Sequence, residues 1–181
     1  MNKQEFASFA MAMKTYYSKE QLLPNQQAME LWFRELQDIP IDVAEAALRK
    51  WVSIQKWSPT IAEIRELASE ISYGDIPDWG EGWKQVCEAM RKFGREYPKS
   101  ALASMDDLTA EATKQLGTWW NLCSSTNVEA DRANFRIIYE SLAKKKKVSQ
   151  QMALPLHEAI YKLQMPSEEQ KFLMGDAHDR P

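Results

Sequence analysis

Apolar side chains recur at helical spacing through the first 147 residues of the chain, and this repeat restricts the fold more than any other feature. No segment alternates apolar and polar residues for long enough to predict a strand. Only six glycines occur, and the helix-favouring residues Ala, Glu, Lys, Leu and Met are abundant. The sequence therefore predicts an all-α fold, with two small helical modules followed by a weakly structured C-terminal tail.

The first module covers residues 1–73 and contains four predicted helices. A break at residues 22–25 ends the first helix, and Pro40 starts the third. The predicted buried stripes are Phe6, Phe9, Ala10, Met13, Tyr16 and Tyr17 in the first helix, Met29, Trp32, Phe33 and Leu36 in the second, and Ile41, Ala44, Leu48, Trp51 and Val52 in the third.

The fourth helix has a well-marked beginning. Ser58 is a favourable N-cap, and Pro59 suits the first helical position. Apolar residues then repeat at helical spacing, namely Ile61, Ile64, Ala68 and Ile71. This pattern predicts a helix that starts at Pro59 and closes the module near residue 72.

The order of these helices resembles the N-terminal domain of phage proteins that load and inhibit the replicative DNA helicase. The similarity covers roughly residues 5–72 and rests on the Trp32-Phe33 helix, the Trp51 helix and the Ser58-Pro59 restart. Members of that family are small non-enzymatic helical proteins of bacteriophage replication modules. The resemblance implies a helicase hexamer as partner, an origin-bound initiator as a second partner, and action in the bacterial host cytoplasm.

A second helical module is predicted over residues 78–147, after a boundary at residues 73–78 that contains Gly74 and Pro77. Asp78 can cap a helix that starts at Trp79, residues 94–104 are predicted to connect, and Gly117 ends a helix over 106–116. A short helical turn over 119–123 and a long helix capped by Asn127 follow. This half resembles the region that follows the loader-type domain in longer phage homologues, to which no distinct chemistry is attached.

The remaining residues, 148–181, carry weaker helical signals. One short helix is predicted from residue 153 to 164, and a capping-box pattern at Ser167 and Gln170 predicts another start. Helices this short are marginal alone, so we expect partial disorder or docking onto a partner. The candidate apolar anchors are Leu163, Met165, Phe172, Leu173 and Met174. A tail packed on its own domain, or an inert one, is the alternative.

Several classes of function lack support in the sequence. No glycine-rich phosphate loop occurs, unlike in helicase loaders that are ATPases. Cys87 and Cys123 have no neighbouring Cys or His, so metal binding is not predicted, and His157 and His178 have no catalytic companion at motif spacing. No apolar run is long enough to cross a membrane, and the N-terminus lacks a signal-peptide pattern. We expect a non-enzymatic protein without a cofactor.

Basic side chains provide an alternative function, DNA binding by the second module. The candidates are Arg91, Lys92, Arg95, Lys144, Lys145, Lys146 and Lys147. Such clusters can contact phosphates. However, the net charge is −3, and the four lysines are also explained as the solvated end of a helix whose dipole they complement. Arg132 lies on the apolar stripe and is predicted to be paired and partly buried.

Lys56 and Trp57 are the candidate partner contacts of the first module, because they lie in the loop between its third and fourth helices, outside the apolar stripes. The favoured function is a phage DNA-replication adaptor that binds the hexameric helicase, inhibits it and loads it at the origin through the initiator. The alternatives are the DNA-binding protein and an inhibitor of another host protein.

Overall fold

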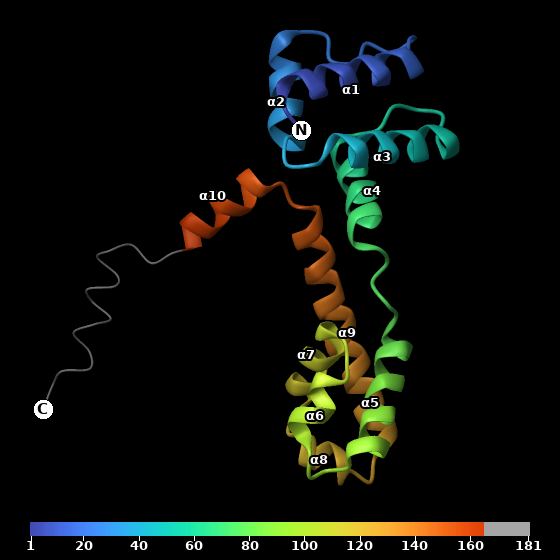
Figure 1. Cartoon of the computed structure of the whole chain (residues 1–181), viewed down its shortest axis with the longest axis vertical. Helices are drawn as coiled ribbons and strands as arrows, with labels where there is room; N and C mark the ends of the chain where they lie inside the picture. The colour runs from blue at the N-terminus through green and yellow to red at the C-terminus, as the bar shows by residue number, and fades with distance from the viewer. Residues whose placement is uncertain (165–181) are drawn as a thin grey trace, which may run out of the picture. The chain divides into compact units, whose positions relative to one another are not determined.

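The computed structural model describes residues 1–164, and over that range the chain forms ten helices and no strand (Figure 1). The helices are α1 (Lys3–Tyr16), α2 (Gln26–Leu36), α3 (Ile41–Ile54), α4 (Ile61–Tyr73), α5 (Trp79–Phe93), α6 (Pro98–Ala103), α7 (Asp107–Leu116), α8 (Trp119–Cys123), α9 (Val128–Gln151) and α10 (Leu154–Gln164). The predicted all-α fold is confirmed.

The described chain divides into two compact units. The first contains residues 1–74 together with residues from 151 onward, and the second contains residues 75–150. None of the helices within residues 1–164 combines the length and the apolar composition that crossing a bilayer requires.

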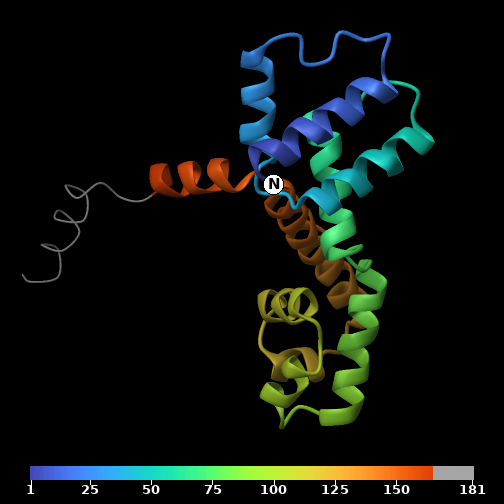
Figure 2. The same ribbon diagram turned by 45° about the horizontal axis from the view of Figure 1, so that its top comes forward.

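The first unit is built on α1, α3 and α4. Helices α1 and α3 lie side by side, and α4 packs most extensively on α3 (Figure 1 and Figure 2). The side chains at the centre of this core are at most 2% exposed, and they include Phe9, Met13, Leu36, Leu48 and Ile64. Each is at a position predicted from helical spacing, and truncating one to Ala costs about 2–5 kcal/mol in a packed core.

The predicted start of α4 is wrong by two residues, because Thr60 rather than Ser58 is the N-cap. The Thr60 hydroxyl accepts a hydrogen bond from the Glu63 N–H at 3.3 Å, and the Glu63 carboxylate accepts one from the Thr60 N–H at 2.7 Å. This reciprocal capping box satisfies two backbone donors. The Ser58 hydroxyl instead donates to the Glu20 carboxylate, and Pro59 lies buried before the helix.

The second unit is centred on contacts between α5, α7 and α9. The Phe135 ring centroid lies 5.3 Å from that of Trp83 and 5.6 Å from that of Tyr139. Gly82 permits this approach, because a Cβ atom there would lie 2.8 Å from the Tyr139 ring. Asp78 caps α5 by accepting from the Gly80 and Glu81 N–H groups, as predicted.

Two boundaries in the second unit differ from the prediction. The segment predicted as a connector contains α6, which begins at Pro98 and buries Ala101. Helix α9 continues to Gln151, four residues beyond the lysine run at 144–147. Proline suits a first helical position, and the run of lysines does not stop a helix because Lys has a high helix propensity.

Candidate partner-binding site on the N-terminal module

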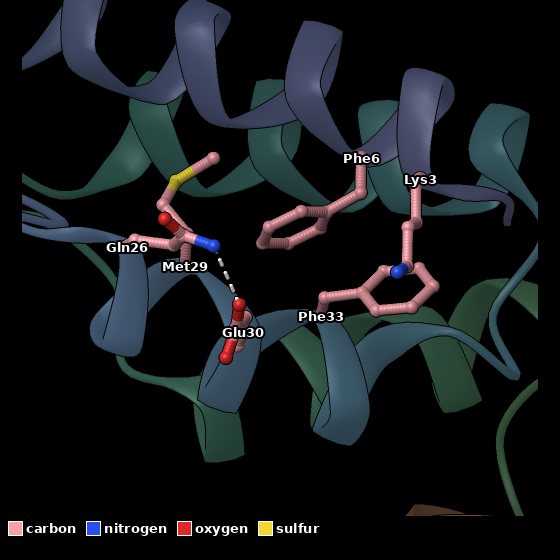
Figure 3. Close-up of a pocket in the computed structure, with 6 residues that line it drawn as sticks. All are labelled: Lys3, Phe6, Gln26, Met29, Glu30 and Phe33. Carbon is pink, nitrogen blue, oxygen red and sulfur yellow. Dashed lines mark hydrogen bonds between the residues drawn. The ribbon is translucent and has the colours of Figure 1, made fainter.

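An apolar pocket of about 220 Å³ lies between α1 and α2 (Figure 3). Phe6 projects into it from α1, and Phe33 from α2, with ring centroids 5.6 Å apart and ring planes inclined by 58°. Met29 lies one helical turn before Phe33 and lines the same pocket. The pocket is smaller than most sites for drug-sized ligands and matches the size of one or two protein side chains.

Polar groups border this pocket at both ends. Lys3 lies beside Phe33 at one end, and Gln26 and Glu30 lie near Met29 at the other (Figure 3). The Gln26 side-chain amide donates a hydrogen bond to the Glu30 carboxylate at 2.9 Å. We call these six residues the α1–α2 groove; they place an apolar floor between one cationic and one anionic rim.

The groove exists because α2 is only partly buried. Leu36 is its one fully buried residue, whereas Met29, Trp32 and Phe33 pack against the core at intermediate exposure. The stripe that predicted these positions as core was therefore correct in direction, but helical spacing cannot distinguish a buried side chain from one at a groove. The sequence analysis missed the groove for this reason, and it also missed the charged border.

Lys56 and Trp57, the contacts proposed from the sequence, lie at a different place on the first unit. Trp57 is 57% exposed, and its carbonyl accepts a hydrogen bond from the Trp51 indole N–H at 2.9 Å. Their loop is joined to the C-terminal side of α1 by the Ser58–Glu20 hydrogen bond. The groove uses the first turns of α1, which is about 20 Å long by helix geometry, so the two candidate sites are distinct.

The apolar anchors proposed in the tail are only partly described. Leu163 is 85% exposed at the end of α10. Met165, Phe172, Leu173 and Met174 lie outside the described residues.

The basic residues at the end of α5 are exposed and lie next to aromatic rings. Arg95 pairs with the Glu96 carboxylate at 3.0 Å, and its guanidinium is 5.8 Å from the Trp120 ring centroid. The Lys92 ammonium is 5.1 Å from the Phe93 ring centroid. Arg91 is exposed on the same last turn. Exposed cations next to an exposed aromatic ring can contact phosphates and bases.

The four lysines at residues 144–147 are exposed but do not end a helix, so the interpretation that they complement the end of the helix dipole is wrong. Consecutive helical residues project about 100° apart, so these four side chains are distributed around the circumference of α9. They therefore do not form one basic face.

Arg132 also differs from its prediction, because it is exposed rather than partly buried in an ion pair. Its guanidinium and that of Arg136 each lie 5.1 Å from the centroid of the Trp79 ring, and Arg136 also pairs with Glu140 at 2.8 Å. These cation–π contacts join α9 to the first residue of α5.

The residues with shifted pKa values do not form a catalytic group within the described part of the chain. Burial raises the pKa of the Cys87 and Cys123 thiols, which keeps them protonated. Asp106 is the N-cap of α7, where it accepts from the Thr109 N–H at 2.9 Å. No group of three or more potential metal ligands occurs within residues 1–164.

Comparison with known proteins gives one finding. Residues 1–65 match the family model for the N-terminal domain of the gene 39 protein, a phage helicase loader and inhibitor. The match contains the whole α1–α2 groove and the Lys56–Trp57 loop. No curated protein and no solved structure matches the chain. The resemblance predicted from the sequence is thus confirmed for the first module: residues 1–65 are similar to the N-terminal domain of a phage helicase loader and inhibitor family.

Proposed function

We propose that this protein is a phage DNA-replication adaptor that binds the replicative hexameric helicase, inhibits it and delivers it to the initiator at the origin. The support is the match of residues 1–65 to a domain of helicase-associated phage proteins. That match leaves open which partner the domain itself contacts.

The observation that carries the proposal is the α1–α2 groove within the matched residues. Its apolar floor between Phe6 and Phe33 suits an apolar anchor from a partner helix, and the charges of Lys3 and Glu30 would orient polar groups beside that anchor. We assign this groove the role of a protein-docking site.

The proposed mechanism is stoichiometric binding rather than catalysis. A protein that binds one conformation of the helicase more tightly than the others shifts the population toward that conformation. Helicase held in this way hydrolyses ATP more slowly until a competing partner, here the initiator, relieves the inhibition.

The test is size-exclusion chromatography with light scattering on the protein mixed with purified helicase and nucleotide, together with an ATPase assay. Met29→Lys places a charge in the groove, and Leu31→Lys places one on the exposed face of the same helix, where Leu31 is 44% exposed. We expect a complex with suppressed ATPase, at least tenfold weaker for Met29→Lys and unchanged for Leu31→Lys. A wild-type protein that neither binds nor inhibits the helicase would contradict the proposal.

A second candidate function, direct DNA binding, is favoured by the exposed Arg91, Lys92 and Arg95 beside Trp120. Three phosphate contacts predict an affinity that falls by about 40-fold between 50 and 200 mM salt. Fluorescence anisotropy with labelled single-stranded and duplex DNA measures this. Replacing the three cations by Ala should abolish the salt dependence, whereas Lys84→Ala on the same helix should retain it. Binding that ignores these changes would exclude this surface.

A further inference from the structure

The described chain returns to the first unit at Gln151, and a buried ion pair lies at that point. Arg65 of α4 and Asp38, which follows α2, form a two-point salt bridge in which Nη1 and Nη2 each lie 2.8 Å from a carboxylate oxygen. Both side chains are only 10% exposed. Buried charges are tolerated when their hydrogen-bonding capacity is satisfied, so the other partners of this pair are informative.

Arg65 makes two further hydrogen bonds, and one of them leaves the N-terminal module in sequence. Its Nη1 also donates to the Glu35 carbonyl at 2.6 Å, which ties α4 to the end of α2. Its Nε donates to the carbonyl of Gln151, the last residue of α9. The end of a helix leaves carbonyls without an intrahelical donor, and Arg65 supplies one.

Asp38 makes the corresponding contact to the start of the next helix. Its Oδ2 accepts a hydrogen bond from the N–H of Leu154, the first residue of α10, at 3.1 Å. The first N–H groups of a helix have no intrahelical acceptor, and a carboxylate is favourable at that end of the helix dipole. Asp38 therefore caps α10 from a position 116 residues away in the sequence.

The residues between the two contacts fit the same place. Ala153 is 3% exposed and directly precedes the capped N–H. The ion pair thus meets a carbonyl, a small buried side chain and the first N–H of a helix, in that order along the chain.

We propose that the Arg65–Asp38 pair is a docking site for residues 151–154 of this same chain, and that it anchors α10 on the N-terminal module. The segment that begins at residue 151 is then part of the first module rather than an independent tail. A partner that engages α10 meets a helix whose start is held by the module that resembles the loader-type domain.

The competing explanation is that the pair stabilises only α2 and α4, and that the contact to residues 151–154 adds nothing. A change made on the side of the tail separates the two. Ala153→Arg cannot fit the buried position, yet it leaves Arg65 and Asp38 intact. Asp38→Asn changes the pair itself, and Glu70→Gln alters the exposed Lys50–Glu70 ion pair on the same helix, α4, as a matched control.

The experiment is hydrogen–deuterium exchange with mass spectrometry on the full chain. We expect peptides spanning residues 151–157 to exchange at least tenfold faster in Ala153→Arg and Asp38→Asn than in wild type, and to be unchanged in Glu70→Gln. Peptides from α1 and α3 should keep their protection in Ala153→Arg.

Three results would overturn the proposal. The first is exchange of residues 151–157 at the unprotected rate in wild type, and the second is unchanged protection in Ala153→Arg. The third is protection that disappears on dilution, which would assign the contact to a second copy of the chain. If Asp38→Asn unfolds the module, loss of protection in α1 will reveal it, and Ala153→Arg then decides.

Discussion

Each unit contains a carboxylate that caps a helix, but the two carboxylates are satisfied differently. In the first unit, Asp38 is neutralised by Arg65 and caps a helix that starts 116 residues later. In the second unit, Asp106 is held by neutral donors, namely Thr109, three residues later, and the side-chain amide of Gln85. The first arrangement connects distant parts of the chain, and the second stabilises its own neighbourhood.

The pKa values of both carboxyl groups lie below their usual range, for different reasons. Burial alone would raise the pKa of Asp38, but hydrogen bonds from Arg65 and from the Leu154 N–H, together with the positive charge of Arg65, outweigh it. Burial also acts to raise the pKa of Asp106, and there the hydrogen bonds from Thr109 and Gln85 prevail without a cation. The charge of Asp106 therefore remains available to act on other groups in the second unit.

The largest expected effect comes from breaking the charged arrangement. Asp38→Ala leaves the Arg65 guanidinium buried without its counterion, which costs about 3–5 kcal/mol of unfolding free energy. Urea denaturation followed by circular dichroism measures the change. A loss below about 1 kcal/mol, the size expected of an exposed ion pair, would show that water replaces the carboxylate.

The uncompensated charge of Asp106 sharpens the comparison at alkaline pH. Burial first, and then the charge of Asp106, raise the pKa of Tyr139 to about 12. A pKa raised in the folded state gives stability that is complete below about 10, the unfolded value, and is lost as the pH rises through the folded value. We expect Tyr139→Phe to lose less stability than wild type between pH 10 and 12 in urea titrations. Parallel curves for the two proteins would contradict this.

The neutral arrangement should be easier to remove than the charged one. Asp106→Ala removes the N-cap of α7 and leaves no unpaired cation, so we expect a cost of about 1–2 kcal/mol. The same urea experiment compares it directly with Asp38→Ala. Equal losses for the two variants would mean that the charge on Arg65 makes no difference.

The smallest expected effect tests the corrected start of α4 in the first unit. Thr60→Ala removes a capping-box hydroxyl and should cost about 1 kcal/mol. Ser58→Ala should change stability by less than about 0.5 kcal/mol, since Ser58 donates only to exposed Glu20. Thermal denaturation of the two variants measures the difference, and the reverse order would restore the start predicted from the sequence.

Much of the fold could be predicted because its signals are local. Asp78 and Asn127 cap the helices that follow them, and Gly117 ends α7 with a φ of 141°. Each of these contacts joins residues at most three positions apart, or depends on one backbone angle. The start of α4 failed although it is local, because Ser58 and Thr60 are both good caps and only the partners Glu63 and Glu20 decide between them.

The candidate site and the tail contact required information that the sequence pattern does not hold. Phe6 and Phe33 were predicted as core residues, and only the partial exposure of α2 turns their contact into a groove. Arg65 was not singled out, because a basic residue on an amphipathic helix is normally solvated. Its partners Asp38 and Gln151 lie 27 and 86 residues away, a distance over which spacing arguments say nothing.

The discontinuity of the first unit has a consequence for its synthesis. Residues 75–150, which are 76 residues, separate the Arg65–Asp38 pair from the segment that completes its hydrogen bonds. At about 5–20 residues per second, a ribosome needs roughly 4 to 15 seconds to make that stretch. During this interval the nascent N-terminal module carries an open site for a carbonyl and a helix start, and the second unit has time to fold before the chain closes it.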